Sequence, residues 1–297
     1  MNRVGVIGAG LMGTAITQQL IAADFEVLAY DVDAAKREAI ARHGAQPQAT
    51  ANGVITGCEI NVLAVFNTEQ VEQVIAGPGG ALEAIAQGGT GPRLFVVTST
   101  CDPDRLAALA KRVAPEGALV LEMPISGTSR QVADGSGVGL VGGDRAVVDK
   151  AKGVLQAICA KLHYLGAVGN ASRAKLAVNL TLGLNRAALA EGLVFASRLG
   201  LEPRGFLDVL RGSAAYSQVM DVKGDIMARR QYLEPQSRID QSLKDFTLML
   251  SQARACGQAL PFAAVYTRML EDCIAHGEGA WDNAAIREAI ARRSSGG

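Results

Sequence analysis

Two polar residues inside an apolar segment are the first candidates for chemistry. Lys175 and Asn179 lie in AKLAVNLTLGL (residues 174–184), where Thr181 is the only other polar residue. If this segment is a helix, their side chains are four residues apart and share one face. An ammonium and an amide there could exchange a proton with a substrate oxygen and hold an anion, because burial lowers the pKa of a lysine toward the range useful for catalysis. A lysine whose ammonium reaches water at a domain edge fits the same spacing.

A glycine pattern near the start of the sequence indicates a second component of a site. Residues 4–13 read VGVIGAGLMG, an apolar run that ends in Gly8, Gly10 and Gly13. In a G-x-G-x-x-G turn the first glycine permits a tight bend, the second lets the backbone approach a pyrophosphate, and the third lets the helix pack on the strand. Leu11 and Met12 begin that helix, so we expect them to contact the dinucleotide as well. Glycines also gather at this spacing in ordinary turns.

An acidic residue in the expected place supports the dinucleotide interpretation. The apolar run 27–30 stops at Asp31, 18 positions after Gly13. A carboxylate there accepts hydrogen bonds from the two hydroxyls of a ribose and would repel a 2′-phosphate. We therefore predict NAD as the cofactor, with NADP possible because Lys36 and Arg37 follow closely.

The segment MPISGTS (residues 123–129) is a candidate substrate loop. It directly follows the apolar run 118–121, and ligands bind at the carboxyl ends of parallel strands. The hydroxyl and amide groups of Ser126, Gly127 and Thr128 could bind a carboxylate. A turn rich in proline, glycine and small residues is the alternative interpretation. Further on, the adjacent pair Lys244 and Asp245 is by itself typical of a helix surface.

The composition excludes several classes of protein. With 297 residues, 49% hydrophobic and 20% charged, the chain is a folded protein long enough for two domains. Its 29 basic and 29 acidic residues balance, so we expect no nucleic acid as partner. No apolar run is long enough to span a bilayer, and a strand-like run follows Met1 where a signal peptide would have its charged region, so we expect no membrane partner and a cytoplasmic location. Three scattered histidines predict no metal site. The five cysteines are odd in number and predict free thiols, at positions 58, 101, 159, 256 and 273.

The elements that must position these residues divide the chain in two. Up to about residue 165, β-branched runs alternate with helical patterns, which is typical of a parallel sheet wrapped by helices. After that the pattern is helical from 170 to 293, with breaks near 200–203, 212–214 and 257–261. We predict an α/β Rossmann domain, doubly wound and mostly parallel, over residues 1–165 and an all-α domain over residues 166–297. The predicted strands are 4–7, 26–30, 60–65, 94–98, 118–121, 138–141 and 162–165, and the predicted helices of the first domain are 12–23, 34–43, 69–75, 103–113 and 145–160.

Together these segments resemble the β-hydroxyacid dehydrogenase family, which includes 3-hydroxyisobutyrate dehydrogenase, tartronate semialdehyde reductase and, more distantly, 6-phosphogluconate dehydrogenase. The resemblance covers almost the whole chain. Residues 6–13 match the opening of the family, and residues 123–127 resemble its D-x-P-V-S-G-G loop. Residues 166–179 resemble its G-x-x-G-x-G-x-x-x-K-x-x-N-N motif, and Lys244-Asp245 matches its late K-D pair. Four motifs in the correct order are more specific than any one of them.

The resemblance implies roles for these residues. Lys175 is then the general acid/base in hydride transfer between NAD(H) and the alcohol carbon of a small 3-hydroxy acid, or back to a 3-oxo acid or semialdehyde. Ser126, Gly127 and Asn179 would hold the substrate carboxylate with Thr128 beside them, and Lys244 would lie near substrate and cofactor. The helical domain would also form a homodimer or homotetramer. The strand-end residues implied to line the cofactor are Val65, Phe66, Asn67, Ser99 and Thr100.

Several positions depart from the family pattern. Glu122 and Met123 replace the usual Asp-Ala, Thr128 and Ala171 replace glycines, and Leu180 replaces the second asparagine. We expect each change to make the pocket wall bulkier or less polar and so to alter the choice of substrate.

Two other functions remain open at this point. An imine reductase shares the architecture, but such enzymes commonly have Asp or Tyr where this chain has Lys175. A non-catalytic module that senses NAD(H) would keep the glycines and Asp31 yet need neither Lys175 nor Asn179.

Overall fold

The computed structural model describes residues 3–87 and 91–293. The chain forms two compact units, Met1–Lys175 and Leu176–Gly297, called unit 1 and unit 2 below. The boundary lies inside one continuous helix, α9 (Asn170–Arg198). The proposed domain limit at residues 165 and 166 stays a prediction.

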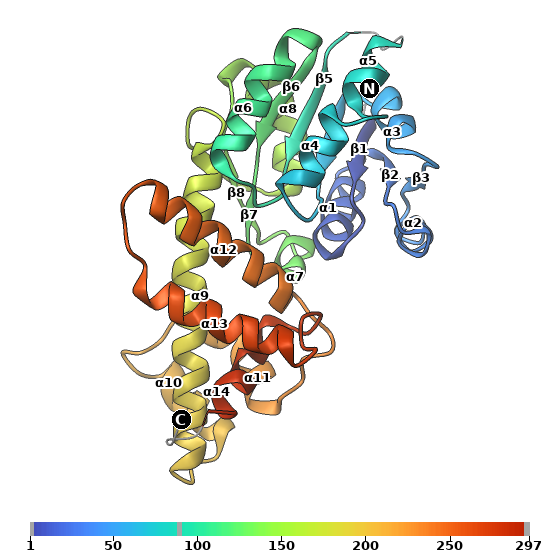
Figure 1. Ribbon diagram of the computed structural model, residues 1–297. Coiled ribbons are helices and arrows are strands. Elements are labelled where there is room, and N and C mark those ends of the chain that lie inside the picture. Colours follow the sequence, from blue (N-terminus) through green and yellow to red (C-terminus); the bar gives the residue numbers. More distant parts are fainter. Residues whose placement is uncertain (1–2, 88–90, 294–297) are drawn as a thin grey trace. The chain divides into compact units, whose positions relative to one another are not determined.

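Unit 1 is built on a six-stranded parallel sheet (Figure 1). Its strand order is β3-β2-β1-β4-β5-β6, so the direction in which strands are added reverses between β1 and β4. Ligands bind at such a reversal, beyond the carboxyl ends of the strands. The strands are β1 (Arg3–Ile7), β2 (Glu26–Tyr30), β3 (Gln46–Pro47), β4 (Ile60–Leu63), β5 (Arg93–Val97) and β6 (Ala118–Glu122).

Helices cover both faces of this sheet, which explains why its central strands β1, β4 and β5 are mostly apolar. Along β5, Leu94 and Val96 belong to one core, whereas Phe95 and Val97 belong to the other. The first core is completed by α1 (Leu11–Ala22), α2 (Ala34–Ala41), α7 (Ser129–Ala133) and α8 (Arg145–Ile158). The second is completed by α3 (Ala51–Gly57), α4 (Thr68–Ala76), α5 (Ala81–Ala86) and α6 (Pro103–Val113). The predicted doubly wound α/β class is confirmed.

A second, smaller sheet corrects one prediction. The predicted strands 138–141 and 162–165 do not join the large sheet. They form a separate sheet in which β8 (Val138–Val141) lies between β7 (Ile125–Ser126) and β9 (Lys161–Tyr164) and pairs with both. The chain leaves β6 at Pro124, which lacks an N–H and cannot continue the ladder, and β7 then pairs antiparallel with β8. Strand β9 is largely exposed, so it lacks the two buried faces of a central strand.

Unit 2 is helical, as predicted. It comprises most of α9, followed by α10 (Pro203–Arg211), α11 (Val219–Arg229), α12 (Ile239–Ala255), α13 (Pro261–Ala275) and α14 (Ile286–Ala291). A break between α11 and α12 was not predicted; there the buried carboxylate of Asp282 accepts from Gln236 N and from Lys223 Nζ (2.7 Å). Arg230 ends α11 in the left-handed region and Pro235 lies within the break, and the contacts of Asp282 hold the segment in place. In the described part of the chain, no helix is both long and apolar enough to cross a bilayer.

Three buried thiols make the free energy of unfolding sensitive to alkali. Burial raises the pKa of Cys58 from 9.0 to about 11, and those of Cys159 and Cys273 from 9.0 to about 12. A thiol whose pKa is higher in the folded state than in the unfolded state stabilises the fold fully below the unfolded value, and this contribution is lost as the pH rises. We therefore expect the stability gap between wild type and Cys159→Ala to narrow between pH 9.5 and 11, by about 1.4 kcal/mol per pH unit.

Urea unfolding at each pH measures this gap. The buried Val154 provides the control, since neither valine nor alanine titrates and the gap between wild type and Val154→Ala should stay constant with pH. A Cys159→Ala gap that is equally constant would contradict the prediction.

Candidate active site

The glycine turn joins β1 to α1 and leaves one side open. Gly8 has φ +101°, and a Cβ there would lie 2.5 Å from the carbonyl oxygen of Ala64. A Cβ at Gly13 would lie 1.8 Å from the carbonyl oxygen of Gly8. A Cβ at Gly10 would meet no described atom within 4 Å. Gly8 and Gly13 are therefore required by the packing of the protein itself, whereas Gly10 leaves room for a ligand at the N-terminus of α1, where phosphate is favoured.

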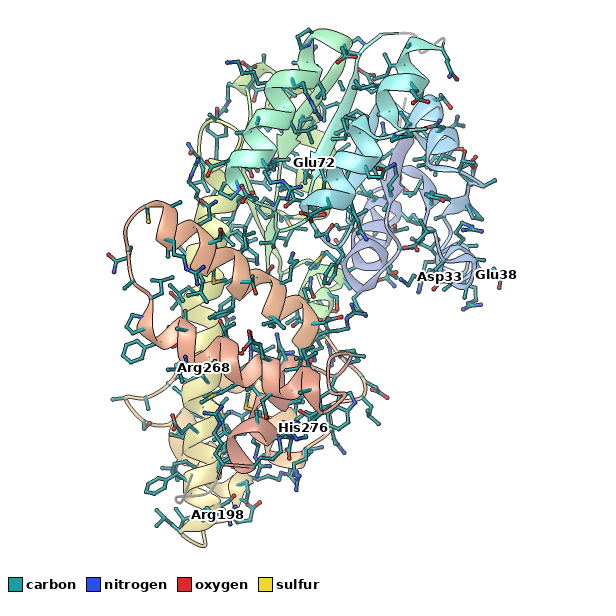
Figure 2. The ribbon with its side chains drawn as sticks, viewed as in Figure 1. Asp33, Glu38, Glu72, Arg198, Arg268 and His276 are labelled. Atoms are coloured by element: carbon teal, nitrogen blue, oxygen red, sulfur yellow. The ribbon has the colours of Figure 1, made fainter. Side chains whose placement is uncertain are left out.

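Asp31 supports the glycine turn directly. Its carboxylate accepts from Ala9 N (2.7 Å) and from Asp33 N (2.9 Å), and the residue is 8% exposed. Asp33 in turn caps α2, at the turn labelled in Figure 2. Each carboxylate oxygen has a second lone pair, so Asp31 can still accept from a ribose hydroxyl. Arg37 donates to the carbonyl oxygen of Asp31 (2.6 Å), which fixes its guanidinium beside this turn.

The predicted strand-end residues share one edge of the sheet. Val65, Phe66 and Asn67 follow β4, while Ser99 and Thr100 follow β5, and the strands are parallel and in register. Ser99 Oγ donates to the carbonyl oxygen of Val65 (2.7 Å), which joins the two strand ends. The side chain of Asn67 caps α4 by accepting from Gln70 N (2.9 Å).

Exposed apolar side chains at this edge are a further sign of a ligand. Among the described residues of unit 1, four large apolar side chains are exposed: Leu11, Val32, Phe66 and Tyr164. The first three follow β1, β2 and β4, the strands on either side of the reversal in strand order. Together with the open side of Gly10 they fit a dinucleotide whose base and ribose would cover apolar surface.

The candidate substrate loop has more regular structure than predicted. Ser126 ends β7, and Gly127 has φ +144°, a conformation that favours glycine. Thr128 caps α7 in a capping box with Gln131, so its hydroxyl already accepts a backbone hydrogen bond. All three residues are half-buried, and the roles of Ser126, Gly127 and Thr128 toward a substrate stay predictions.

Lys175 is held beside this loop. The residue is 7% exposed, and its Nζ donates to the carbonyl oxygen of Ile125 (2.7 Å), one residue before Ser126. The ammonium is thus fixed next to the polar groups of Ser126 and Gly127 within unit 1. The backbone carbonyl of Ile125 was not foreseen, because an apolar residue gives no sign that its carbonyl will bind a lysine.

In unit 2, the predicted site residues Asn179 and Lys244 are both bound to the carboxylate of Asp245. Asn179 Nδ2 donates to Asp245 Oδ2 (2.8 Å), and Lys244 Nζ lies 3.0 Å from Asp245 Oδ1. The side chains of Lys244 and Asp245 are 19% and 10% exposed, so the interpretation of this pair as a helix surface is wrong. The apolar neighbours Leu243 and Phe246 were the available sign that this stretch of α12 is buried.

Three of the residues that depart from the family pattern are buried. Glu122, Met123 and Ala171 are all 0% exposed, so the expectation that they line a pocket wall is wrong. Met123 packs in the core beneath β6, and Glu122 binds backbone N–H groups at the start of α9. These three side chains contribute to the packing of unit 1 and do not contact a ligand.

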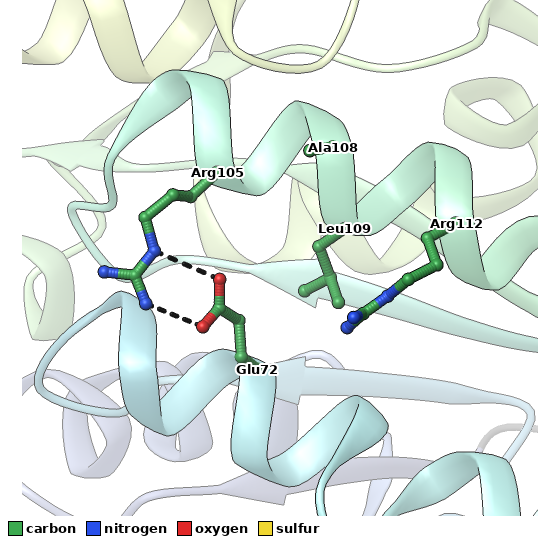
Figure 3. A pocket seen from close by; sticks show the side chains of 5 residues that line it. All are labelled: Glu72, Arg105, Ala108, Leu109 and Arg112. Atoms are coloured by element: carbon green, nitrogen blue, oxygen red, sulfur yellow. Dashed lines mark hydrogen bonds and ion pairs between the residues drawn. The ribbon is translucent and has the colours of Figure 1, made fainter.

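A hollow elsewhere on unit 1 holds none of the predicted site residues. It measures about 220 Å³ and lies between α4 and α6, with Glu72 and Arg105 paired across it and Ala108, Leu109 and Arg112 along one side (Figure 3). The ion pair between Glu72 and Arg105 joins the two helices at one end of the hollow, which is typical of a structural contact. Within the described residues, no three His, Cys, Asp or Glu side chains are gathered where they could hold a metal ion.

A doubly wound sheet with an open glycine turn at its reversal defines a dinucleotide-binding protein. Residues 3–166 match the family model described as the NAD binding domain of 6-phosphogluconate dehydrogenase, and residues 169–290 match the model described as NAD-binding of NADP-dependent 3-hydroxyisobutyrate dehydrogenase. The chain belongs to the β-hydroxyacid dehydrogenase family and is an NAD(P)-dependent oxidoreductase.

Individual relatives resemble the chain over nearly its whole length. It is 31% identical to L-threonate dehydrogenase of Cupriavidus necator, over 96% of this chain and 95% of that protein. It is 29% identical to 2-hydroxy-3-oxopropionate reductase of Escherichia coli K12, over 97% of each. A crystal structure of 3-hydroxyisobutyrate dehydrogenase from Salmonella typhimurium has a TM-score of 0.87 at 24% identity, over 96% of this chain and 99% of that one, and supports the fold.

Proposed function

We propose that this protein interconverts a small 3-hydroxy acid and the corresponding 3-oxo acid or semialdehyde, with NAD(H) as the redox partner and Lys175 as the general acid/base. The observation that carries the proposal is the position of Lys175: its buried ammonium is fixed to the carbonyl of Ile125, directly beside Ser126 and Gly127. An ammonium with three N–H groups can keep that hydrogen bond and still exchange a proton with a substrate oxygen.

The proton and the hydride leave the substrate along separate routes. In the oxidising direction, neutral Lys175 takes the proton of the hydroxyl group as the carbon–oxygen double bond forms. In the reducing direction, its ammonium returns that proton to the carbonyl oxygen. The nicotinamide ring, when bound, accepts or supplies the hydride.

The substrate is proposed to be bound by polar groups of the candidate substrate loop (residues 123–129) and of the helical domain. We propose that Ser126, Gly127 and Asn179 hold the substrate carboxylate, with Thr128 and Lys244 beside it. A small substrate with a hydroxyl group near a carboxylate agrees with the names of two relatives, an L-threonate dehydrogenase and a 2-hydroxy-3-oxopropionate reductase.

The cofactor is proposed to be NAD in preference to NADP. The backbone from Gly8 to Gly13 would hold the pyrophosphate, and Asp31 the ribose hydroxyls, where a carboxylate disfavours a 2′-phosphate. Val32, the next residue, is 85% exposed and offers no positive charge, whereas the Arg37 guanidinium, which donates to the carbonyl oxygens of Asp31 and Val32, keeps NADP possible. Val65, Phe66, Asn67, Thr100 and Lys244 are proposed as the remaining cofactor contacts.

The setting of the enzyme is also a proposal. We infer that it acts in the cytoplasm as a homodimer or homotetramer, with residues 1–165 binding the dinucleotide and residues 166–297 binding substrate and the partner copy. Size-exclusion chromatography with light scattering measures the state of assembly.

An absorbance assay at 340 nm tests the proposed reaction. The panel should hold 3-hydroxy acids that differ in chain length, second hydroxyl groups and amino, sulfonate or phosphate ends, each with NAD and with NADP. We expect turnover of at least one 3-hydroxy acid, and a higher kcat/KM with NAD. Reduction of cyclic imines but of no oxo acid would instead favour an imine reductase. Tight NADH binding without any turnover would favour a sensor module.

A further inference from the structure

We propose that Glu122 is a positioning residue for Lys175: it fixes the first turn of α9 to the end of β6, so that the Lys175 ammonium meets the carbonyl of Ile125. This inference rests on the proposed role of Lys175 as the general acid/base. All the residues concerned belong to unit 1.

Glu122 gathers hydrogen-bond donors at the start of α9. Its Oε1 accepts from Gly169 N (2.6 Å) and Ala171 N (2.9 Å), and its Oε2 accepts from Ser172 N (3.0 Å) and from the hydroxyl of Ser172. The first N–H groups of a helix lack partners within the helix, and they carry the positive end of its dipole. One buried carboxylate thus satisfies three of these groups from a strand 47 to 50 positions earlier in the chain.

The surroundings of Glu122 are shaped to accommodate it. Gly142 pairs with Glu122 through two backbone hydrogen bonds, Glu122 N to Gly142 O (2.8 Å) and Gly142 N to Glu122 O (3.0 Å). A Cβ at Gly142 would lie 2.5 Å from Glu122 Oε1 and 3.0 Å from the carbonyl oxygen of Ala167. Any side chain at position 142 would therefore displace the carboxylate from the start of α9.

The full acceptor capacity of a carboxylate is needed here. Burial raises the pKa of Glu122, and the hydrogen bonds from Ser172, Ala171 and Gly169 oppose that rise. All four groups donate to the carboxylate, and only the Ser172 hydroxyl could accept instead, so the amide N–H groups of a glutamine would face at least one backbone N–H. Substituting Gln for Glu122 would therefore leave buried N–H groups facing each other while keeping the side-chain volume.

The link to Lys175 is short and made at two points. Glu122 and Ile125 lie three residues apart in the connection from β6 to β7, and Ser172 and Lys175 lie three residues apart on α9. Glu122 is joined to Ser172 through its carboxylate, and Ile125 is joined to Lys175 through its carbonyl oxygen, which accepts from Nζ. If the first joint opens, the first turn of α9 can move, and Lys175 Nζ can leave its carbonyl. Errors of about 1 Å in the position of a reacting group lower rates about 100-fold.

The test compares Glu122→Gln with a control that is destabilised elsewhere in unit 1. Val154→Ala removes buried methyl groups from α8, a helix that carries none of the predicted site residues. We expect Glu122→Gln to lower kcat for the best hydroxy acid of the panel by about 10- to 100-fold with an unchanged KM for NAD. Val154→Ala should lower Tm and leave kcat unchanged. If Glu122→Gln behaves like Val154→Ala, the positioning role is wrong.

A readout that needs no substrate follows Lys175 itself. Brief labelling with acetic anhydride, quantified by peptide mass spectrometry, measures how fast Lys175 Nζ is acetylated. We expect this rate to be at least threefold higher in Glu122→Gln than in wild type, and equal to wild type in Val154→Ala. Gly142→Ala should reproduce the Glu122→Gln result, and it serves if Glu122→Gln does not fold. Unchanged labelling in the folded variant overturns the proposal.

The two proposals fail in different ways. Wild-type kcat in Lys175→Ala would remove the general acid/base and leave Glu122 as a purely structural residue. Loss of kcat in Lys175→Ala, with wild-type kcat and labelling in Glu122→Gln and Gly142→Ala, would remove only the positioning role.

Discussion

Replacing Lys175 by alanine is expected to lower kcat by about two to four orders of magnitude, the usual contribution of a general acid/base. The variant removes the only group assigned to exchange the hydroxyl proton, whereas the glycine turn that would hold the dinucleotide is untouched. Steady-state kinetics on the best hydroxy acid of the panel give the effect on kcat and on KM separately.

Two controls accompany this variant. NADH binding, followed by fluorescence titration, should match wild type, because Lys175 Nζ donates to the carbonyl oxygen of Ile125, beside the candidate substrate loop. Lys175→Arg should also be slow, since a guanidinium keeps the charge but does not give up its proton at neutral pH. Wild-type-like turnover in Lys175→Ala would sink the assignment.

Two alanine substitutions in the glycine turn are expected to separate folding from cofactor binding. Gly13→Ala places a Cβ 1.8 Å from the carbonyl oxygen of Gly8, so we expect it to lower the free energy of unfolding by about 1 to 3 kcal/mol or more and to weaken NADH binding. Gly10→Ala meets no described atom within 4 Å, so we expect a wild-type Tm. Its methyl group would instead occupy the approach of the pyrophosphate and raise the Kd for NADH about 10- to 100-fold, equivalent to about 1.4 to 2.8 kcal/mol.

Thermal unfolding and NADH titration of the same two samples measure both effects. The informative result is the contrast, because each variant adds one methyl group to the same turn. Unaltered NADH affinity in a folded Gly10→Ala would show that the pyrophosphate does not pass beside Gly10.

Sequence reasoning reached most of unit 1 because its signals are local. The glycine spacing identified the β1–α1 turn. The predicted helices 103–113 and 145–160 begin where α6 and α8 begin, directly after Asp102 and Asp144, whose carboxylates accept backbone N–H groups. The fold class and the use of NAD(P) follow from such short patterns, and both are confirmed, whereas the preference for NAD over NADP stays a prediction.

The remaining features depend on contacts between distant segments. The second sheet could not be predicted, since Val138–Val141 has the composition of any buried strand and its partners are chosen by the turn at Pro124. Glu122 reads as a polar end to an apolar run, and its partners lie about 50 residues further on. Asp245 was discounted because an adjacent Lys-Asp pair carries no sign of burial by itself.

The contact between Asn179 and Asp245 decides which atoms Asn179 can offer. A carboxylate only accepts, so the amide nitrogen of Asn179 must face it, and one of its two N–H groups is already used. One N–H and the carbonyl oxygen remain. Asn179 can therefore act as donor and acceptor at once, which matches a molecule that carries both a carboxylate and a hydroxyl group. Asp245 thereby fixes the polarity of a side chain whose two ends have nearly the same shape.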